Sequence, residues 1–402
     1  MTRARRAAGS DRPLLIIFLI VFVNLIGFGI IIPLLPFYAT QMGASAFTIG
    51  LLFASYSVAQ LIAAPVLGGL SDRWGRRPVL IFSLLGTVIS FGMLAMATSV
   101  AWVFASRIVD GLSGGNISTA RAYIGDVTTL ENRAKGFGLI GAAFGLGFIV
   151  GPALGGALGH LSYAAPAWGA ALIAAAAAAL AWAWLPETVH RPASHATATP
   201  GAPWTGIAEM VRRPVVGRLL VIDFLYWMTF AAYQTTFALF GARRFGFDVP
   251  QTGYLLAVVG ALGVMTQLGA VGPVVRRFGE ARTLAGGLAL AGLGLLIATL
   301  SHSVAVFAVA LVPGAVGVAL AIPSLTSLIS QSAARDEQGR VQGVSSALEG
   351  LGRSVGPVWG NGLLGYYSEG AAFGTAAAVL FGTALLATRV TPPENPARDA
   401  AG

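Results

Sequence analysis

The sequence predicts an all-α membrane protein, with twelve transmembrane helices in two pseudo-symmetric six-helix halves. Three observations support this prediction. The 402 residues are 56% apolar and only 10% charged, against about 25% charged in ordinary soluble domains. The apolar residues form repeated runs of about 20 residues, the length at which a helix spans the hydrocarbon core. A set of glycines and prolines also recurs at a constant offset along the chain.

Twelve apolar segments can be followed along the chain. They lie at about 14–38, 47–70, 78–98, 100–124, 136–160, 165–185, 214–241, 251–275, 282–300, 303–331, 340–366 and 371–390. The first resembles a signal peptide, because arginines precede it. Its apolar run is longer than the roughly 7–15 residues of a signal-peptide core, so we predict a retained first helix.

The arginines predict the orientation of these helices. They gather before the first segment, at Arg3, Arg5 and Arg6, and in the even-numbered loops, whereas the first and third loops carry no charge. Short positively charged loops stay on the cytoplasmic side. We therefore predict that both termini and the even-numbered loops are cytoplasmic. The arginine pair at 243–244 is the one exception, and Asp248 partly offsets it.

A polar segment at 186–213 separates the two sets of six helices. It is rich in Pro, Ala, Thr and His, a composition typical of linkers. We predict an N-terminal half at 1–185, a cytoplasmic linker, and a C-terminal half at 214–402. His190 and His195 in the linker have no other type of metal ligand beside them. We therefore expect a solvated linker, no metal site and no cofactor.

The two halves are internal repeats of each other. The fifth segment carries Gly147 and Gly151-Pro152, and the eleventh carries Gly352 and Gly356-Pro357 at an offset of 205 residues. Parallel repeats of this kind are typical of transporters that hold their substrate near the bilayer midplane, between two halves that rock. The repeat therefore indicates a secondary transporter.

A charged turn joins the second and third segments. Residues 68–78 read G-G-L-S-D-R-W-G-R-R-P, which resembles the signature loop of the major facilitator superfamily. We expect Gly68 to allow a close approach of helices and Gly75 to permit a tight turn. The residues assigned to this gating loop are Gly68, Asp72, Arg73, Gly75, Arg76 and Arg77.

Asp72 is expected to meet a helix N-terminus or an arginine when the cytoplasmic side is closed. The alternative is that the three arginines of the loop only anchor the topology. Anchoring requires neither an aspartate nor glycines, so the composition of the loop favours a gate.

Three further motifs extend the resemblance to drug:proton antiporters of this superfamily. The first segment, from Asn24 to Pro36, is similar to their helix 1, and residues 107–115 resemble their helix 4 motif. The fifth segment resembles the helix 5 motif associated with antiporters, through Gly147, Gly151, Pro152, Gly155 and Gly156. The signature loop continues as R-P-V-L, as in tetracycline efflux proteins.

Ionisable side chains inside predicted spans are costly and therefore mark candidate functional sites. Arg107 and Asp110 lie three residues apart, on one face of a helix. The resemblance ties Arg107 to proton coupling, which makes Asp110 the nearest carboxylate able to exchange a proton. The alternative is a permanent structural ion pair. Glu349, four residues before Arg353, is a second candidate for proton coupling, or a partner in a plain intrahelical pair.

A stripe of aromatic and polar residues on the seventh segment is a candidate wall of the substrate cavity. Asp223 shares this stripe, but we rank it below the other two acids because it follows Arg218 closely and is expected near the cytoplasmic surface. The alternative role of the stripe is packing. The candidate cavity residues are Asn24, Asp223, Tyr226, Trp227, Tyr233 and Gln234.

The resemblance implies a proton-coupled transporter that exports a small, largely apolar organic compound by alternating access. Tetracycline efflux proteins carry acidic residues where this chain has Asn24 and Ser90. These departures weigh against tetracycline itself and move the coupling to Asp110 or Glu349. The alternatives are a proton symporter that imports a metabolite, and a receptor or regulator with this fold that no longer transports.

We expect no enzyme, because the sequence has no nucleotide-binding loop and no nucleophile constellation. The expected partners are a small organic substrate, protons and the lipid bilayer. Nucleic acid is not expected despite the net charge of +9, because the arginines lie in short loops rather than on one face. We expect a monomer in the cytoplasmic (inner) membrane of a bacterium.

Overall fold

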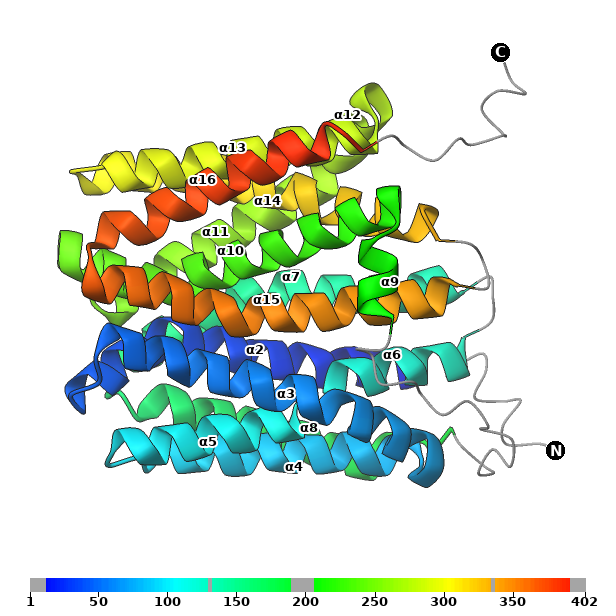
Figure 1. Cartoon of the computed structure of the whole chain (residues 1–402). Helices are drawn as coiled ribbons and strands as arrows, with labels where there is room; N and C mark the ends of the chain where they lie inside the picture. Colours follow the sequence, from blue (N-terminus) through cyan, green and yellow to red (C-terminus); the bar gives the residue numbers. More distant parts are fainter. Residues whose placement is uncertain (1–11, 129–131, 189–205, 334–336, 391–402) are drawn as a thin grey trace, which may run out of the picture. The chain divides into compact units, whose positions relative to one another are not determined.

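The computed structural model describes residues 12–128, 132–188, 206–333 and 337–390, which form helices joined by short turns (Figure 1). Arg3, Arg5 and Arg6 lie outside these ranges. Among the described residues, ten helices are long and apolar enough to cross a membrane.

The helices follow the predicted segments. In the first half they are α2 (Arg12–Gln41), α3 (Ala46–Trp74), α4 (Arg76–Ala95), α5 (Val100–Ser113), α6 (Asn116–Val127), α7 (Arg133–Gly159) and α8 (Ala165–Trp184). The remainder are α9 (Ile207–Val211), α10 (Pro214–Phe245), α11 (Val249–Gly269), α12 (Val271–Phe278), α13 (Glu280–Leu300), α14 (Val304–Gln331), α15 (Gln338–Tyr366) and α16 (Glu369–Ala387).

The fourth predicted segment is interrupted, because α5 ends before Gly114 and α6 begins after Gly115. Both glycines lie where α3 leaves no room for a side chain. A Cβ on Gly114 would lie 2.8 Å from Nε2 of Gln60, and one on Gly115 would lie 2.6 Å from Cδ1 of Leu67. The Gln60 amide also donates a hydrogen bond to the Gly114 carbonyl at 3.2 Å, so α3 satisfies backbone that the helix break exposes.

The contacts divide the chain into two compact units. The first unit comprises 1–199, 234–261 and 357–369, and the second comprises 200–233, 262–356 and 370–402. These units are not the two halves of the sequence repeat. The C-terminal ends of α10 and α15 and the first part of α11 join the first unit, where α11 packs closely against α7. A Cβ on Gly253 of α11 would lie 2.9 Å from the backbone nitrogen of Gly156.

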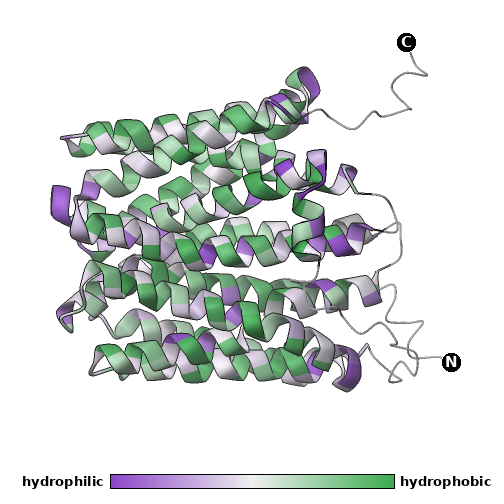
Figure 2. Ribbon diagram, in the orientation of Figure 1, coloured by the Kyte–Doolittle hydropathy of each residue, from purple (hydrophilic) through white to green (hydrophobic). Residues whose placement is uncertain are grey.

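Small residues allow the helices of the first unit to pack closely. The side of α8 that faces α2 and α4 is built from buried alanines, among them Ala174, Ala177 and Ala181. Small side chains let backbones approach in lipid, where no hydrophobic force drives helix association. Figure 2 shows apolar colour along the helices and hydrophilic colour gathered at turns such as the one between α3 and α4.

The predicted linker ends in a short helix rather than in irregular chain. Within the predicted linker at 186–213, the described residues include the five-residue helix α9, while His190 and His195 lie outside the described residues. Ion pairs hold α9 within the second unit: Glu209 accepts from Arg340 at 2.5 Å and from Arg213 at 3.1 Å.

Arg213 also pairs with Glu337 at 2.7 Å, so the end of the linker is tied to the start of α15. The hydrogen bond from Arg340 lowers the pKa of Glu209, and the one from Arg213 lowers the pKa of Glu337. A lowered carboxyl pKa gives stability that is present above the ordinary glutamate range and is lost as the pH falls through the folded value. The pairs therefore stay charged at neutral pH.

Candidate functional site

The signature loop is a tight turn between α3 and α4. Gly75 ends α3 and begins α4 with φ +107°, in the left-handed region that favours glycine. The expected tight turn at Gly75 is therefore confirmed. The expected close approach at Gly68 is not found, because no atom of the described residues, other than those of its own stretch of α3, lies within 4 Å of the position of its Cβ.

Arg76 is the hub of the loop. Its guanidinium pairs with Asp72 at 2.6 Å and with Asp126, near the end of α6, at 3.1 Å. It also donates to the Ser71 hydroxyl at 2.7 Å. Asp72 thus meets an arginine, and this arginine is the first residue of α4, across the Gly75 turn. The expected link between this contact and a closed cytoplasmic side stays a prediction. Arg76 thereby ties the α3–α4 turn to the C-terminal end of α6.

Glu187, which sequence analysis missed, caps the first turn of α4. Its two carboxylate oxygens accept the backbone N–H groups of Arg76 and Arg77 at 3.0 and 3.1 Å. These are among the N–H groups that a helix start leaves without partners, and a carboxylate there also meets the positive end of the helix dipole. The only sequence signal was an acid directly after the last apolar residues of α8.

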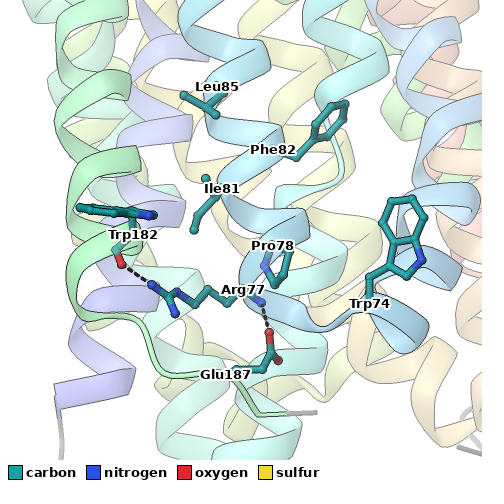
Figure 3. Close-up of a pocket in the computed structure, with 8 residues that line it drawn as sticks. All are labelled: Trp74, Arg77, Pro78, Ile81, Phe82, Leu85, Trp182 and Glu187. Carbon is teal, nitrogen blue, oxygen red and sulfur yellow. Dashed lines mark hydrogen bonds between the residues drawn. The ribbon is translucent and has the colours of Figure 1, made fainter. Parts of the chain in front are cut away.

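A shallow groove of about 620 Å³ runs beside this turn, between α4 and α8. Figure 3 shows Arg77 crossing the groove, with its backbone N–H on Glu187 and its guanidinium on the Trp182 carbonyl. The lining residues are Trp74, Arg77, Pro78, Ile81, Phe82, Leu85, Trp182 and Glu187. None of the predicted substrate-cavity residues is among them, so this groove is not the cavity that the sequence predicted.

Arg107 and Asp110 form a buried ion pair on α5. Their side chains are 3% and 11% exposed, and Nη1 of Arg107 lies 3.1 Å from Oδ2 of Asp110. The guanidinium carbon of Arg107 sits 5.5 Å from the centre of the Phe91 ring, a cation–π geometry. The predicted pairing of these two residues on one helix face is confirmed.

Polar side chains surround this ion pair, but they do not satisfy every hydrogen-bond donor of Arg107. Ser90 and Thr87 of α4 lie beside the Asp110 carboxylate, and the Ser90 hydroxyl donates to the Thr87 carbonyl at 3.0 Å. Two buried nitrogens of Arg107, Nε and Nη2, have no hydrogen-bond partner among the described residues. A buried donor without a partner costs about 1–3 kcal/mol, so this site leaves hydrogen-bonding capacity free. Ser90, where the resemblance expected an acid, thus contacts an acid supplied by α5.

The glycines of the helix 5 motif lie against α2. A Cβ on Gly147 would lie 2.6 Å from Cβ of Leu25, and one on Gly151 would lie 2.7 Å from Cα of Gly29. A Cβ on Gly155 would likewise lie 3.1 Å from the Ile30 carbonyl oxygen. These glycines are therefore a packing face at which two backbones touch. Pro152 lies inside α7, and Gly156 faces Pro250 of α11.

The second repeat makes the same kind of contact between helix glycines and a neighbouring backbone, within the second unit. A Cβ on Gly352 would lie 2.8 Å from the Met228 nitrogen, and one on Gly356 would lie 3.0 Å from Cβ of Ala231. The helices that touch are α15 and α10, the counterparts of α7 and α2. The offset of 205 residues therefore corresponds to equivalent helix contacts in the two repeats.

Asp223 is buried between α10 and α15. It is 3% exposed, and Oδ2 accepts a hydrogen bond from Ser345 of α15 at 2.6 Å. This face of α10 is covered by α15, so Asp223 is screened from solvent, and its expected depth near the cytoplasmic surface stays a prediction. Glu349 and Arg353, on the same helix as Ser345, both act electrostatically on the Asp223 carboxylate.

The aromatic stripe of α10 is partly a packing surface. The Tyr226 ring stacks on Phe230 at 5.9 Å and meets Trp227 edge-on at 5.6 Å. Tyr233 packs against Phe373 of α16 at 5.6 Å. Trp227 and Phe230 are half-buried, whereas Tyr226 is buried. The remaining predicted cavity residues are the half-buried Asn24 on α2 and the buried Gln234 on α10.

Comparison with known proteins agrees with this geometry. The family model described as the Major Facilitator Superfamily matches residues 17–271 and 268–402. Tetracycline resistance protein, class C, of Escherichia coli is 34% identical over 357 residues, which cover 87% of this chain and 89% of that protein. Multidrug resistance protein 2 of Bacillus subtilis (strain 168) is 31% identical, covering 85% and 86% of the two chains.

A solved structure extends the comparison to the fold. The crystal structure of the human organic anion transporter MFSD10 (TETRAN) superposes with a TM-score of 0.70 at 26% identity, covering 96% of this chain and 100% of that one. Family model, relatives and fold agree over nearly the whole sequence. The chain is therefore a multi-pass membrane protein that belongs to the major facilitator superfamily.

Proposed function

We propose that the chain exports a small, largely apolar organic compound from the cytoplasm in exchange for protons, by alternating access. The observation that carries the proposal is the similarity, over 87% of the chain, to a protein named for tetracycline resistance. A relative named for multidrug resistance, at 31% identity, supports a broader range of compounds. Asn24 and Ser90, at the two positions where acids were expected, favour a substrate other than tetracycline.

The proposed parts have distinct tasks. The halves at 1–185 and 214–402 rock about a central substrate site, and the Asp72–Arg76 pair belongs to a gate on the cytoplasmic side. Arg107 and Asp110 respond to the proton, because a buried carboxylate beside an arginine changes the net charge of the site when it is protonated. The protein acts as a monomer in the cytoplasmic membrane of a bacterium.

Transport into everted membrane vesicles tests this function directly. An acidic interior is imposed, and uptake of ethidium and of tetracycline is measured by fluorescence. We expect accumulation of ethidium that collapses when a protonophore removes the pH gradient, and weaker accumulation of tetracycline. Accumulation that persists after the pH gradient is removed would contradict proton coupling. If none of a panel of compounds were transported, the receptor alternative would be favoured.

Replacing Asp72 by asparagine is expected to lower transport about tenfold while leaving expression unchanged. Asp72 is 61% exposed, and exposed ion pairs contribute only about 0–1 kcal/mol to stability. The loss therefore falls on the gate rather than on the fold. Asp72→Glu, which keeps the charge opposite Arg76, is the matched control. Equal transport by Asp72→Asn and the wild type would reduce the loop to a topology anchor.

Cysteine labelling is expected to place the two ends of α14 on opposite sides of the membrane. The chain contains no cysteine, so a thiol-reactive label attaches only to the cysteine that is introduced. His302, before α14, and Gln338, at the start of α15, are both exposed. We expect His302→Cys to react with an impermeant maleimide in intact cells and Gln338→Cys to react only after lysis. The reverse pattern would invert the predicted orientation.

A further inference from the structure

The groove between α4 and α8 is apolar along most of its length and has a cation at one end (Figure 3). Phe82 and Leu85 of α4 and Trp182 of α8 line it with exposed side chains. Both helices are long and apolar enough to cross a membrane. In a spanning helix, exposed apolar side chains contact the acyl chains of lipids. The groove is therefore open to the bilayer.

Tryptophans place one end of this groove at the level of the lipid headgroups. Trp74 is the last residue of α3, and Trp182 and Trp184 belong to the last turn of α8. Their side chains are 69%, 69% and 70% exposed. Tryptophan is enriched where membrane spans meet the interface, because its ring has an apolar body and a polar N–H. The end of the groove beside the signature loop thus lies near the lipid phosphates.

Arg77 brings to this end a charge that the described residues do not neutralise. The ion pairs of the loop within the described chain belong to Arg76, which meets Asp72 and Asp126. The Arg77 guanidinium instead donates one hydrogen bond, from Nη2 to the Trp182 carbonyl. Its Nε has no hydrogen-bond partner among the described residues. Arg77 therefore keeps both its charge and part of its hydrogen-bonding capacity.

Glu187 also lines the groove, but its carboxylate is bound to backbone. Its oxygens accept the N–H groups of Arg76, Arg77 and Thr188 at 3.0, 3.1 and 2.8 Å. The start of α4, with its N–H groups and helix dipole, compensates the charge of this carboxylate. The Arg77 side chain runs the other way, toward the Trp182 carbonyl (Figure 3). A cationic site therefore remains at the polar end of the groove.

We propose that the groove binds one anionic phospholipid, with its phosphate on the Arg77 guanidinium and an acyl chain along α4 and α8. A guanidinium stays charged and offers several N–H donors to phosphate oxygens. Arginines near helix ends also reach the interface with their long side chains. A lipid with a net negative charge neutralises the site, whereas a zwitterionic lipid brings an ammonium group for which Glu187 is already bound to backbone N–H groups.

The spacing along α4 supports the position of the acyl chain. Arg77, Ile81 and Leu85 line the groove at intervals of four residues, so they lie on one stripe of the helix. The headgroup contact and the apolar contacts thus follow one line, from the end of the span into the bilayer. This binding requires no transport, so it is independent of the proposed function.

Quenching of Trp182 by brominated lipids tests the site directly. The chain has 8 tryptophans, and a parent variant with phenylalanine in place of all the others reports on the groove alone. The full-length protein is placed in phosphatidylcholine vesicles that contain increasing fractions of dibrominated phosphatidylglycerol or, as reference, dibrominated phosphatidylcholine. With phosphatidylglycerol we expect half-maximal quenching at a mole fraction about fivefold lower, the effect of one arginine near a charged membrane surface.

Matched variants separate this site from the general charge of the loop. Arg77→Gln is expected to remove the preference for phosphatidylglycerol, whereas Arg77→Lys keeps most of it. Arg73→Gln removes the same charge from an exposed arginine that does not line the groove, and we expect the preference to stay. Quenching by brominated phosphatidylcholine is expected to be equal in all variants, which verifies that each is folded with Trp182 facing lipid.

Four results would overturn the proposal. They are equal quenching by the two lipids in the parent variant, a preference that survives Arg77→Gln, equal losses in Arg73→Gln and Arg77→Gln, and a stronger preference for dibrominated phosphatidylethanolamine than for phosphatidylglycerol. The proposal would also be wrong if neither lipid quenched Trp182, because another molecule, such as a second copy of the chain, would then cover the groove. None of these outcomes bears on export driven by a pH gradient, since lipid binding is measured without substrate.

Discussion

Replacing Gly151 by alanine is expected to abolish most of the assembled, active protein. The added Cβ would lie 2.7 Å from Cα of Gly29 and 2.8 Å from the Ile26 carbonyl oxygen. Both neighbours are backbone atoms of α2, so no side-chain rotation relieves the clash. Overpacking costs about 1–3 kcal/mol where side chains adjust, and we expect at least the upper end here. Thermal unfolding of the purified protein measures the loss.

Gly138→Ala is the matched control on the same helix. No atom of the described residues, other than those of its own stretch of α7, lies within 4 Å of the position of its Cβ, and alanine favours a helix over glycine by about 1 kcal/mol. We therefore expect normal or raised stability. The second repeat offers the same comparison, with Gly356 in contact and Gly343 open. If Gly151→Ala unfolded at the same temperature as Gly138→Ala, the contact between α2 and α7 would be looser than the structure has it.

The contrast between Gly138 and Gly151 also shows what sequence can reveal about this fold. Length and hydropathy predicted the helices, because a span needs only a sufficient apolar run. The repeated glycine spacing predicted a close-packed face, which α7 and α15 both form. The break after α5 was not predictable, because it depends on Gln60 and Leu67 of α3 reaching Gly114 and Gly115.

The candidate sites divide in the same way. Arg107 and Asp110 lie within about one helical turn of each other, and local spacing predicted that they share one helix face. For Asp72 the sequence predicted an arginine or a helix N-terminus as the partner, but not that this partner is Arg76. Glu187 and Asp223 were missed or ranked low, because their partners lie more than 100 residues away. The Glu187 carboxylate accepts hydrogen bonds from the start of α4, which lies beside it only in the folded chain. Contacts across the fold, rather than residue type, decide such roles.

Replacing Asp110 by asparagine is expected to abolish uphill export driven by a pH gradient. Asparagine keeps the shape of the side chain but cannot exchange a proton, and it leaves Arg107, at 3% exposure, without its counter-charge. Removing one partner of a buried pair costs about 3–5 kcal/mol, so the stability of the variant also falls. Proteoliposomes with an imposed pH gradient measure accumulation. Counterflow exchange, which moves no net proton, measures the remaining conformational cycle.

The double variant Arg107→Gln, Asp110→Asn separates the two effects. Without the stranded arginine, we expect stability and counterflow to recover while gradient-driven accumulation stays absent, because the site no longer titrates. Recovery of accumulation in the double variant would make the pair structural rather than proton-coupling. If Asp110→Asn accumulated substrate and Glu349→Gln did not, the coupling proton would belong to Glu349 rather than to Asp110. If both single variants accumulated substrate, proton coupling through these buried acids would be wrong.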